Sequence, residues 1–156
     1  KASHKDRGDR IFTSQQKSDC WDKARVVPGR DPSRWRADPA GNVVFKQFRG
    51  CLGCLCHEYD HITPYSKGGK TELSNCQILQ TQVNRWKGAK EKADGEEQRK
   101  AGCGVTFSER ELDALEMAWY GNVNRLGLKC KCKTIGEMEA LLGFTNKGAA
   151  FNNYKP

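Results

Sequence analysis

One stretch of this 156-residue chain, from His57 to Gly88, constrains its structure more than any other. It opens with an alternating run of apolar and polar residues that ends in the pair Asp60-His61. Asn75 follows His61 by fourteen positions, and Asn84 follows Asn75 by nine. Carboxylate, imidazole and amide groups are candidate metal ligands and proton acceptors. Their grouping in one short stretch makes it the candidate functional site.

The same stretch predicts two short strands and a helix. In chain order we expect a strand at 57–63, a loop at 64–75, a strand at 76–79 and a helix at 80–89. Gly68 and Gly69 permit the turn that the loop needs. A strict pleat would send Asp60 and His61 to opposite faces of the first strand. We therefore expect this strand to bend or end before Pro64.

These residues and spacings resemble the HNH nuclease motif, here in its His-Asn-Asn form. The resemblance covers about a quarter of the chain, residues 51–90. It implies an α+β protein whose core is a ββα-metal unit, a β-hairpin packed on one helix with a divalent cation clamped between them. Residues 29–59 are also similar to HNH-domain proteins of plants and algae.

The resemblance implies a role for each motif residue. His61 would be the general base that activates water, because an imidazole can be neutral and basic near pH 7. Asp60 and Asn84 would supply hard oxygen ligands to Mg²⁺ or Mn²⁺. Asn75 would hold the base in its orientation. The implied activity is that of a metal-dependent endonuclease or nickase that hydrolyses DNA and leaves 3′-hydroxyl and 5′-phosphate ends.

Two cations beside Asn84 are candidates for phosphate binding. Arg85 and Lys87 lie on the predicted helix and could clamp the substrate backbone. The formal net charge of +8 also favours a polyanionic partner such as DNA or another nucleic acid. The sequence has no run of about 18 apolar residues, so it predicts no membrane-spanning helix.

The cysteines raise the question of a structural Zn²⁺ ion. Many HNH proteins have a Cys-x-x-Cys pair before the first strand and a second pair on the helix. Cys51 and Cys54 match the first pair, but Gln80 and Val83 stand where the second pair would be, and neither is a zinc ligand. Either the zinc is lost and the two thiols are packing residues, or downstream cysteines complete the site. The downstream candidates are Cys103, Cys130 and Cys132.

The remaining chain predicts the domain organisation around the motif. We expect a basic flexible tail (1–19), an N-terminal hairpin extension (20–50), the HNH core (51–90), a linker (91–104), C-terminal helices that pack on the core (105–143) and a final tail (144–156). Capping boxes at Ser108-x-x-Glu111 and Thr134-x-x-Glu137 mark the starts of two helices. The eight cysteines are closely spaced, which favours a reducing compartment over a secreted disulfide framework.

Two other functions are compatible with the sequence. The fold could serve as an accessory subunit in a larger organellar assembly, with protein partners instead of catalysis. The resemblance to plant and algal proteins is the reason to expect an organelle, either a mitochondrion or a plastid, and the alternative is another intracellular location. The chain could also be a zinc-stabilised nucleic-acid-binding module, which requires Cys51 and Cys54 to find two further ligands.

Overall fold

The structure is a computed structural model that describes residues 10–90, 94–125 and 128–129. It divides into two compact units, residues 1–106 and 107–156, which are described separately. None of the described helices is long and apolar enough to cross a membrane. The mixed content of short sheets and helices agrees with the predicted α+β class.

The first unit begins with a helix that the sequence did not lead us to expect. Helix α2 (Ser14–Lys23) starts at a capping box, in which the Thr13 hydroxyl accepts from the Gln16 amide and the Gln16 side chain accepts from the Thr13 amide. Trp21 is fully buried on this helix, and Phe12 just before it is 4 % exposed. Within the predicted flexible tail (1–19), Phe12 is therefore part of the core and residues 14–19 are helical, so the prediction of a tail is wrong for this part.

A three-stranded antiparallel sheet follows, with strand order β1-β2-β3. Its strands are β1 (Arg25–Val26), β2 (Trp35–Ala37) and β3 (Val43–Phe45). β2 and β3 form the predicted hairpin, and the buried rings of Trp35 and Phe45 pack at 4.5 Å between centroids. The buried carboxylate of Asp38 accepts from the backbone amides of Asn42 and Gln80 and so ties this hairpin to the next sheet.

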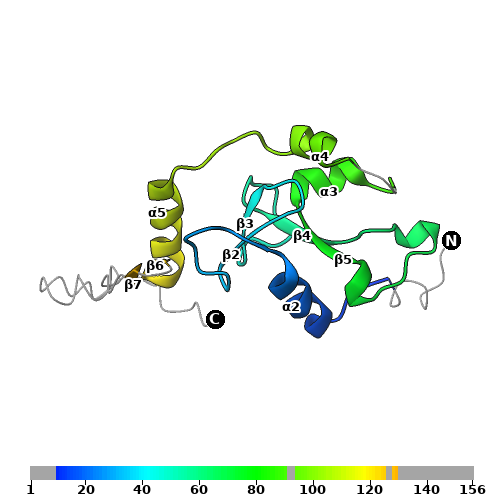
Figure 1. Ribbon diagram of the computed structural model, residues 1–156, viewed down its shortest axis with the longest axis horizontal. Coiled ribbons are helices and arrows are strands. Elements are labelled where there is room, and N and C mark those ends of the chain that lie inside the picture. Colours follow the sequence, from blue (N-terminus) through cyan, green and yellow to red (C-terminus); the bar gives the residue numbers. More distant parts are fainter. Residues whose placement is uncertain (1–9, 91–93, 126–127, 130–156) are drawn as a thin grey trace, which may run out of the picture. The chain divides into compact units, whose positions relative to one another are not determined.

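The motif folds as a second hairpin with a helix on it. Strands β4 (His57–His61) and β5 (Cys76–Gln80) are antiparallel, with Asp60 opposite Gln77 and His61 opposite Cys76. Two 3₁₀ turns, η1 (Tyr65–Lys67) and η2 (Leu73–Asn75), shape the loop between them. Helix α3 (Thr81–Lys87) follows β5 directly and packs on both strands (Figure 1). The predicted ββα arrangement is confirmed, with the first strand ending at His61, two residues short of the predicted end.

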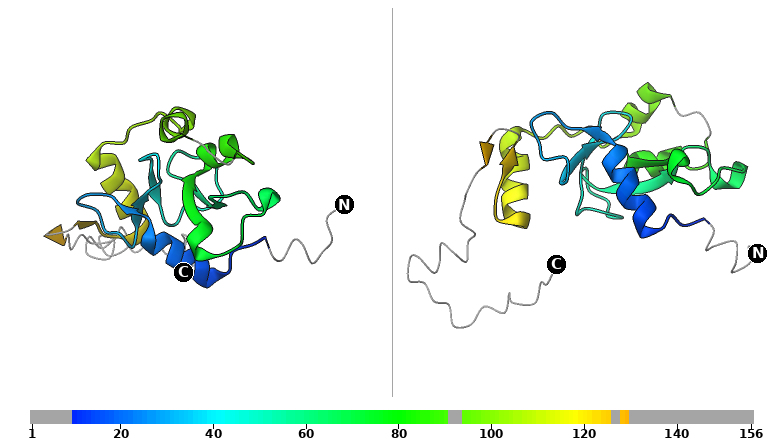
Figure 2. Two further views of the ribbon diagram at one scale, coloured as in Figure 1. Left: turned by 45° about the vertical axis from the view of Figure 1, so that its right-hand side comes forward. Right: turned by 60° about the horizontal axis from the view of Figure 1, so that its bottom comes forward.

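The two faces of the β4–β5 hairpin have different neighbours. Cys76 and Ile78 share a buried cluster with Phe12, Cys20 and Trp21, so one face packs on α2. The alternating residues face α3, as the contacts of Asp60 with Lys87 and of Glu58 with Asn84 show. Figure 2 gives two further views of the same ribbon. The hairpin is therefore a middle layer between two helices.

Helix α4 (Gly95–Ala101) lies within the predicted linker and starts at Asp94, whose side chain accepts from the Glu96 amide. Its contacts with α3 place it in the first unit.

The second unit contains helix α5 (Glu109–Tyr120) and a hairpin of β6 (Asn124–Arg125) and β7 (Leu128–Lys129). The predicted capping box at Ser108 and Glu111 is present, and Gly121 ends the helix with a positive φ of 69°. The second predicted C-terminal helix, which begins after Thr134, lies outside the described residues.

Candidate active site

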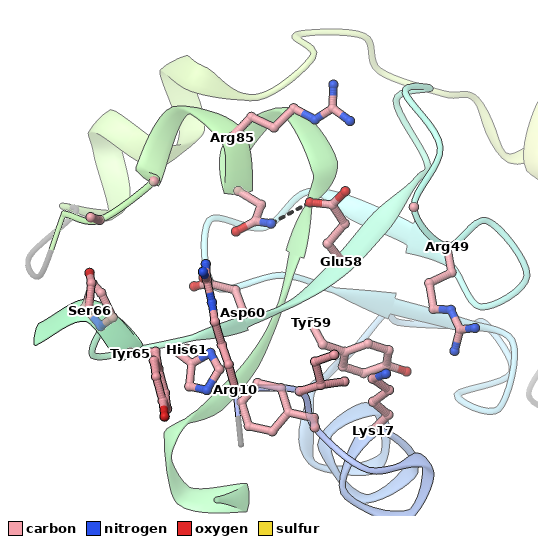
Figure 3. Close-up of a pocket in the computed structure, with 17 residues that line it drawn as sticks. Arg10, Lys17, Arg49, Glu58, Tyr59, Asp60, His61, Tyr65, Ser66 and Arg85 are labelled. Carbon is pink, nitrogen blue, oxygen red and sulfur yellow. Dashed lines mark hydrogen bonds between the residues drawn. The ribbon is translucent and has the colours of Figure 1, made fainter. Parts of the chain in front are cut away.

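The α3 face of β4 presents two carboxylates to the helix. Glu58 and Asp60 are two residues apart and therefore point to the same side of the strand (Figure 3). Asn84 Nδ2 donates to Glu58 Oε2, and this bond fixes which way the Asn84 amide faces. Because its nitrogen is engaged, the Asn84 Oδ1 atom is available as a ligand, with no protein donor among the described residues. The motif assigned no role to Glu58, yet Glu58 orients a predicted metal ligand.

Asp60 is held from two directions. Lys87 Nζ lies 3.0 Å from Asp60 Oδ2, and Gln77 Nε2 donates to the same oxygen at 2.9 Å. Both contacts use Oδ2, so Oδ1 has no protein partner in the described part of the chain. The carboxylate is thus fixed in place while one oxygen is left for a ligand.

Lys87 does not occupy the position that the sequence predicted for it. Its side chain is 2 % exposed, and besides Asp60 its ammonium donates to the backbone oxygen of His61 at 2.9 Å. A buried ammonium with these partners cannot reach a phosphate. Lys87 instead holds the Asp60 carboxylate and the backbone of His61 in place. Arg85, two residues earlier, is exposed and lines the pocket as expected.

His61 lies on the other face of β4, toward α2. The strand keeps its regular pleat to its last residue, so Asp60 and His61 do point to opposite sides. Figure 3 shows Tyr59 and His61 on the side of β4 away from Glu58 and Asp60. Of the two expected alternatives, a bend or an end before Pro64, the structure shows the end, because β4 stops at His61. Asp60 and His61 both line a pocket at this end of the strand.

The His61 ring is enclosed by groups from outside the motif strand. The Phe12 ring stacks on it at 4.3 Å between centroids and 29°, and Tyr65 packs edge-on at 5.9 Å. Nε2 lies 3.0 Å from the Thr71 hydroxyl. Burial, at 9 % exposure, lowers the His61 pKa below its ordinary value, and the nearby charges of Arg10 and Lys87 act in the same direction against Asp60. The lowered pKa favours the neutral imidazole, which is the form that can accept a proton.

Asn75 holds the loop that follows β4. Its Oδ1 accepts from the Thr63 amide at 2.8 Å, and its Nδ2 donates to the carbonyls of Thr63 and Lys70. Gly69 passes so close that a Cβ there would lie 1.9 Å from the Thr63 oxygen, which leaves no room for a side chain. Asn75 makes no hydrogen bond to His61 itself, so any effect on the base is transmitted through the loop.

One pocket of about 630 Å³ gathers these groups at the outer edge of β4. β4 pairs only with β5, apart from a bridge between Arg49 and His57 at its start, so side chains from both of its faces reach this edge. Asp60, His61 and Asn84 all line it. Four cations also line it, from the N-terminal segment, α2, the segment before β4 and α3: Arg10, Lys17, Arg49 and Arg85.

The donor atoms fit a hard divalent cation. Asp60 and Asn84 each offer an oxygen without a protein donor among the described residues, on one side of one pocket. Oxygen donors suit Mg²⁺ or Mn²⁺, and Mg²⁺ is typically held by only one or two protein groups with several waters retained. The described residues contain no cluster of three or more His, Cys, Asp or Glu side chains that could hold a metal.

The predicted zinc knuckle is arranged differently. Cys51 is disulfide-bonded to Cys56, and Cys54 to Cys103. These bonds match neither expected alternative, because Cys51 and Cys54 are neither free packing thiols nor thiolates open to zinc. Cys20 and Cys76 are the free, buried cysteines of the described chain. Cys130 and Cys132 lie outside the described residues.

Sequence reasoning missed several residues at this site. Phe12 and Arg10 lie outside the motif, and Thr71 lies in its loop, where no motif position falls. Glu58 did carry one, because it shares a strand face with Asp60.

Residues 48–90 match the sequence model of the HNH endonuclease family. Comparisons with curated proteins and with solved structures found no match. The matched range contains the β4–β5 hairpin and α3, and with them Asp60, His61 and Asn84. This match supports nuclease activity in general, and nucleases of this family typically use a divalent metal. Residues 48–90 of this chain are therefore similar to an HNH endonuclease domain.

Proposed function

We propose that this protein is a metal-dependent endonuclease that hydrolyses phosphodiester bonds of DNA, cutting one or both strands. The observation that carries the proposal is the single pocket at the edge of β4. A neutral imidazole, two free ligand oxygens and a rim of guanidinium groups meet there, within a matched HNH domain. These are the groups that phosphodiester hydrolysis requires: a base, a cation site and phosphate contacts.

His61 is the base in this proposal. It takes a proton from the attacking water, and its neutral state at pH 7 makes it competent to do so. Asp60 and Asn84 would hold a divalent cation through their side-chain oxygens, with Lys87 and Glu58 fixing the orientation of the two side chains. A divalent cation bound there supplies the positive charge that stabilises the departing 3′-oxygen. The products are a 3′-hydroxyl and a 5′-phosphate.

The cationic rim positions the substrate. Three exposed arginines line the pocket: Arg10, Arg49 and Arg85. A guanidinium group can donate two parallel hydrogen bonds to one phosphate. Figure 3 shows Arg10, Arg49 and Arg85 at different places around the pocket. The DNA backbone would pass along the open edge of β4 between them.

Incubation of the purified protein with supercoiled plasmid tests the proposal. We expect relaxed or linear DNA with Mg²⁺ or Mn²⁺, and none with EDTA. His61→Ala should slow cleavage by roughly 10²- to 10⁴-fold with little change in DNA affinity, because it removes a general base and no phosphate contact. The ratio of relaxed to linear product separates a nickase from a double-strand endonuclease.

A parent protein that cleaves neither DNA nor RNA with any of these metals contradicts the proposal. If it also binds no nucleic acid, the role of an assembly subunit is favoured, and partners should then be sought by co-purification.

A further inference from the structure

We propose that Thr71 sets the tautomer of His61 by accepting a hydrogen bond from Nε2–H, so that the lone pair lies on Nδ1. The observation is the 3.0 Å contact between His61 Nε2 and Thr71 Oγ1. Nδ1 has no hydrogen-bond partner among the described residues. A neutral imidazole has one N–H and one lone pair, and the group bound to one nitrogen decides which nitrogen is basic.

The position of Thr71 is fixed by two separate anchors. On one side, Gln16 of α2 donates from Nε2 to the Thr71 carbonyl at 3.1 Å. On the other, Asn75 Nδ2 donates to the carbonyl of Lys70, the preceding residue, at 2.9 Å. The hydroxyl that faces His61 is therefore carried on a backbone segment held at two successive residues. A loop residue fixed in this way can act as a permanent hydrogen-bond partner.

The imidazole is also held against rotation. Phe12 stacks on one face of the ring at 4.3 Å, and the edge of Tyr65 packs nearby at 5.9 Å. At 9 % exposure the ring has little room to turn over and exchange its two nitrogens. With Nε2 directed at Thr71, Nδ1 is the remaining nitrogen that can accept a proton from a water in the pocket.

The two tautomers of His61 differ in which ring nitrogen carries the proton and which one has a lone pair. With the proton on Nε2, the N–H is bonded to the Thr71 oxygen and the Nδ1 lone pair is free for water. With the proton on Nδ1, Nε2 would instead accept from the Thr71 hydroxyl, and the ring would present an N–H to the pocket. The proposed base requires the first tautomer, because only that tautomer presents the Nδ1 lone pair to a water in the pocket. Thr71 is thus a positioning residue for the base, and this role rests on the proposed function.

The tautomer can be read directly from the ¹⁵N shifts of the imidazole rings in the full-length, metal-free protein at about pH 8, above the ordinary histidine pKa. The chain has three histidines, and His61→Ala identifies the His61 signals. We expect a protonated Nε2 and an unprotonated Nδ1 in the parent. Thr71→Val keeps the shape but removes the hydroxyl, and should give a mixture of tautomers. Thr71→Ser should restore the parent pattern.

The rate of DNA cleavage should depend on which tautomer of His61 is populated. With Thr71→Val we expect the rate to fall by roughly 10- to 100-fold and to recover with Thr71→Ser, while the fold seen in amide spectra is unchanged. Thr71→Ala serves as a second variant if valine disturbs the loop. Thr106→Val, at an exposed threonine, makes the same chemical change as a control and should alter neither tautomer nor rate.

A parent His61 protonated mainly on Nδ1, or a Thr71→Val protein with the parent tautomer ratio, overturns the proposal. These readouts need no catalysis, so they remain decisive if the parent proves to be inactive. Inactivity of the parent would instead contradict the nuclease function.

Discussion

Lys87 and Asp60 form an ion pair of 3.0 Å beneath the candidate active site, with side chains 2 % and 13 % exposed. The ammonium also binds the carbonyl of His61, so one lysine on α3 contacts both residues of the Asp-His pair. Lys87 thereby joins the helix to the end of β4. This contact explains why a lysine three residues after Asn84 belongs to the site without touching substrate.

Lys87→Met should lower the free energy of unfolding by roughly 2–4 kcal/mol, because it leaves the Asp60 carboxylate and the His61 carbonyl without their buried donor. Urea melts would measure the change. Lys100→Met is a matched control, since its partner Glu96 and Lys100 itself are more than 70 % exposed. That change should cost well under about 1 kcal/mol. Equal effects of the two changes would contradict the supporting role of Lys87.

The salt dependence of DNA binding should separate the rim cations from Lys87. Replacing Arg49 and Arg85 together with alanine should reduce the slope of log K against log salt by up to about 1.8, because each phosphate that a cation neutralises contributes about 0.9. Lys87→Met should leave the slope unchanged, because the ammonium is buried. Arg25→Ala with Lys100→Ala removes the same charge outside the pocket and is the control. A slope that falls equally in both double variants would show that only net charge matters.

Acid should destabilise the fold through His57. This fully buried imidazole has its pKa lowered from 6.5 to about 4, chiefly by burial. Between these values the unfolded chain binds a proton that the folded chain does not, so stability is complete above about pH 6.5 and falls as the pH decreases toward 4. The decrease is on the order of 3 kcal/mol. Denaturant melts across this range should show it, and His57→Phe should remove that part of the pH dependence.

The disulfides should contribute unequally to stability. Cys54–Cys103 closes a loop of 49 residues, whereas Cys51–Cys56 closes one of 5. Loop entropy predicts about 4 kcal/mol for the first and about 2 kcal/mol for the second. Thermal unfolding of Cys103→Ser and Cys56→Ser proteins compares them. Thiol counting with elemental analysis tests the zinc alternative, because about one zinc per chain and no disulfides would mean that these sulfurs bind metal.

The sequence predicted the scaffold of the site because local signals encode it. Alternation marks β4, the two glycines mark its loop, and the capping box at Ser108 marks the start of α5. The first helix has the same kind of signal at Thr13 and Gln16, but its polar sequence gave no amphipathic pattern around Trp21 to support it. For this reason the prediction of a flexible tail was wrong for residues 14–19.

The supporting contacts of the site could not be predicted in the same way. The contact of Lys87 with Asp60 and that of Glu58 with Asn84 depend on how α3 packs on the hairpin. Phe12 precedes the first sheet in the sequence and His61 follows it, yet their rings stack on each other. Spacing along a sequence does not predict such tertiary contacts between side chains, because they depend on how the helices and strands pack.

The stacking of Phe12 on His61 also limits how the HNH domain can be transplanted. A fragment cut at the borders of the family match, residues 48–90, would lack the ring that covers the base and the Gln16 amide that holds Thr71. Its candidate site residues would all be present, but His61 would be open to water on one face. A graft of this domain onto another protein should therefore begin upstream of Phe12, because the structural unit around His61 is larger than the motif.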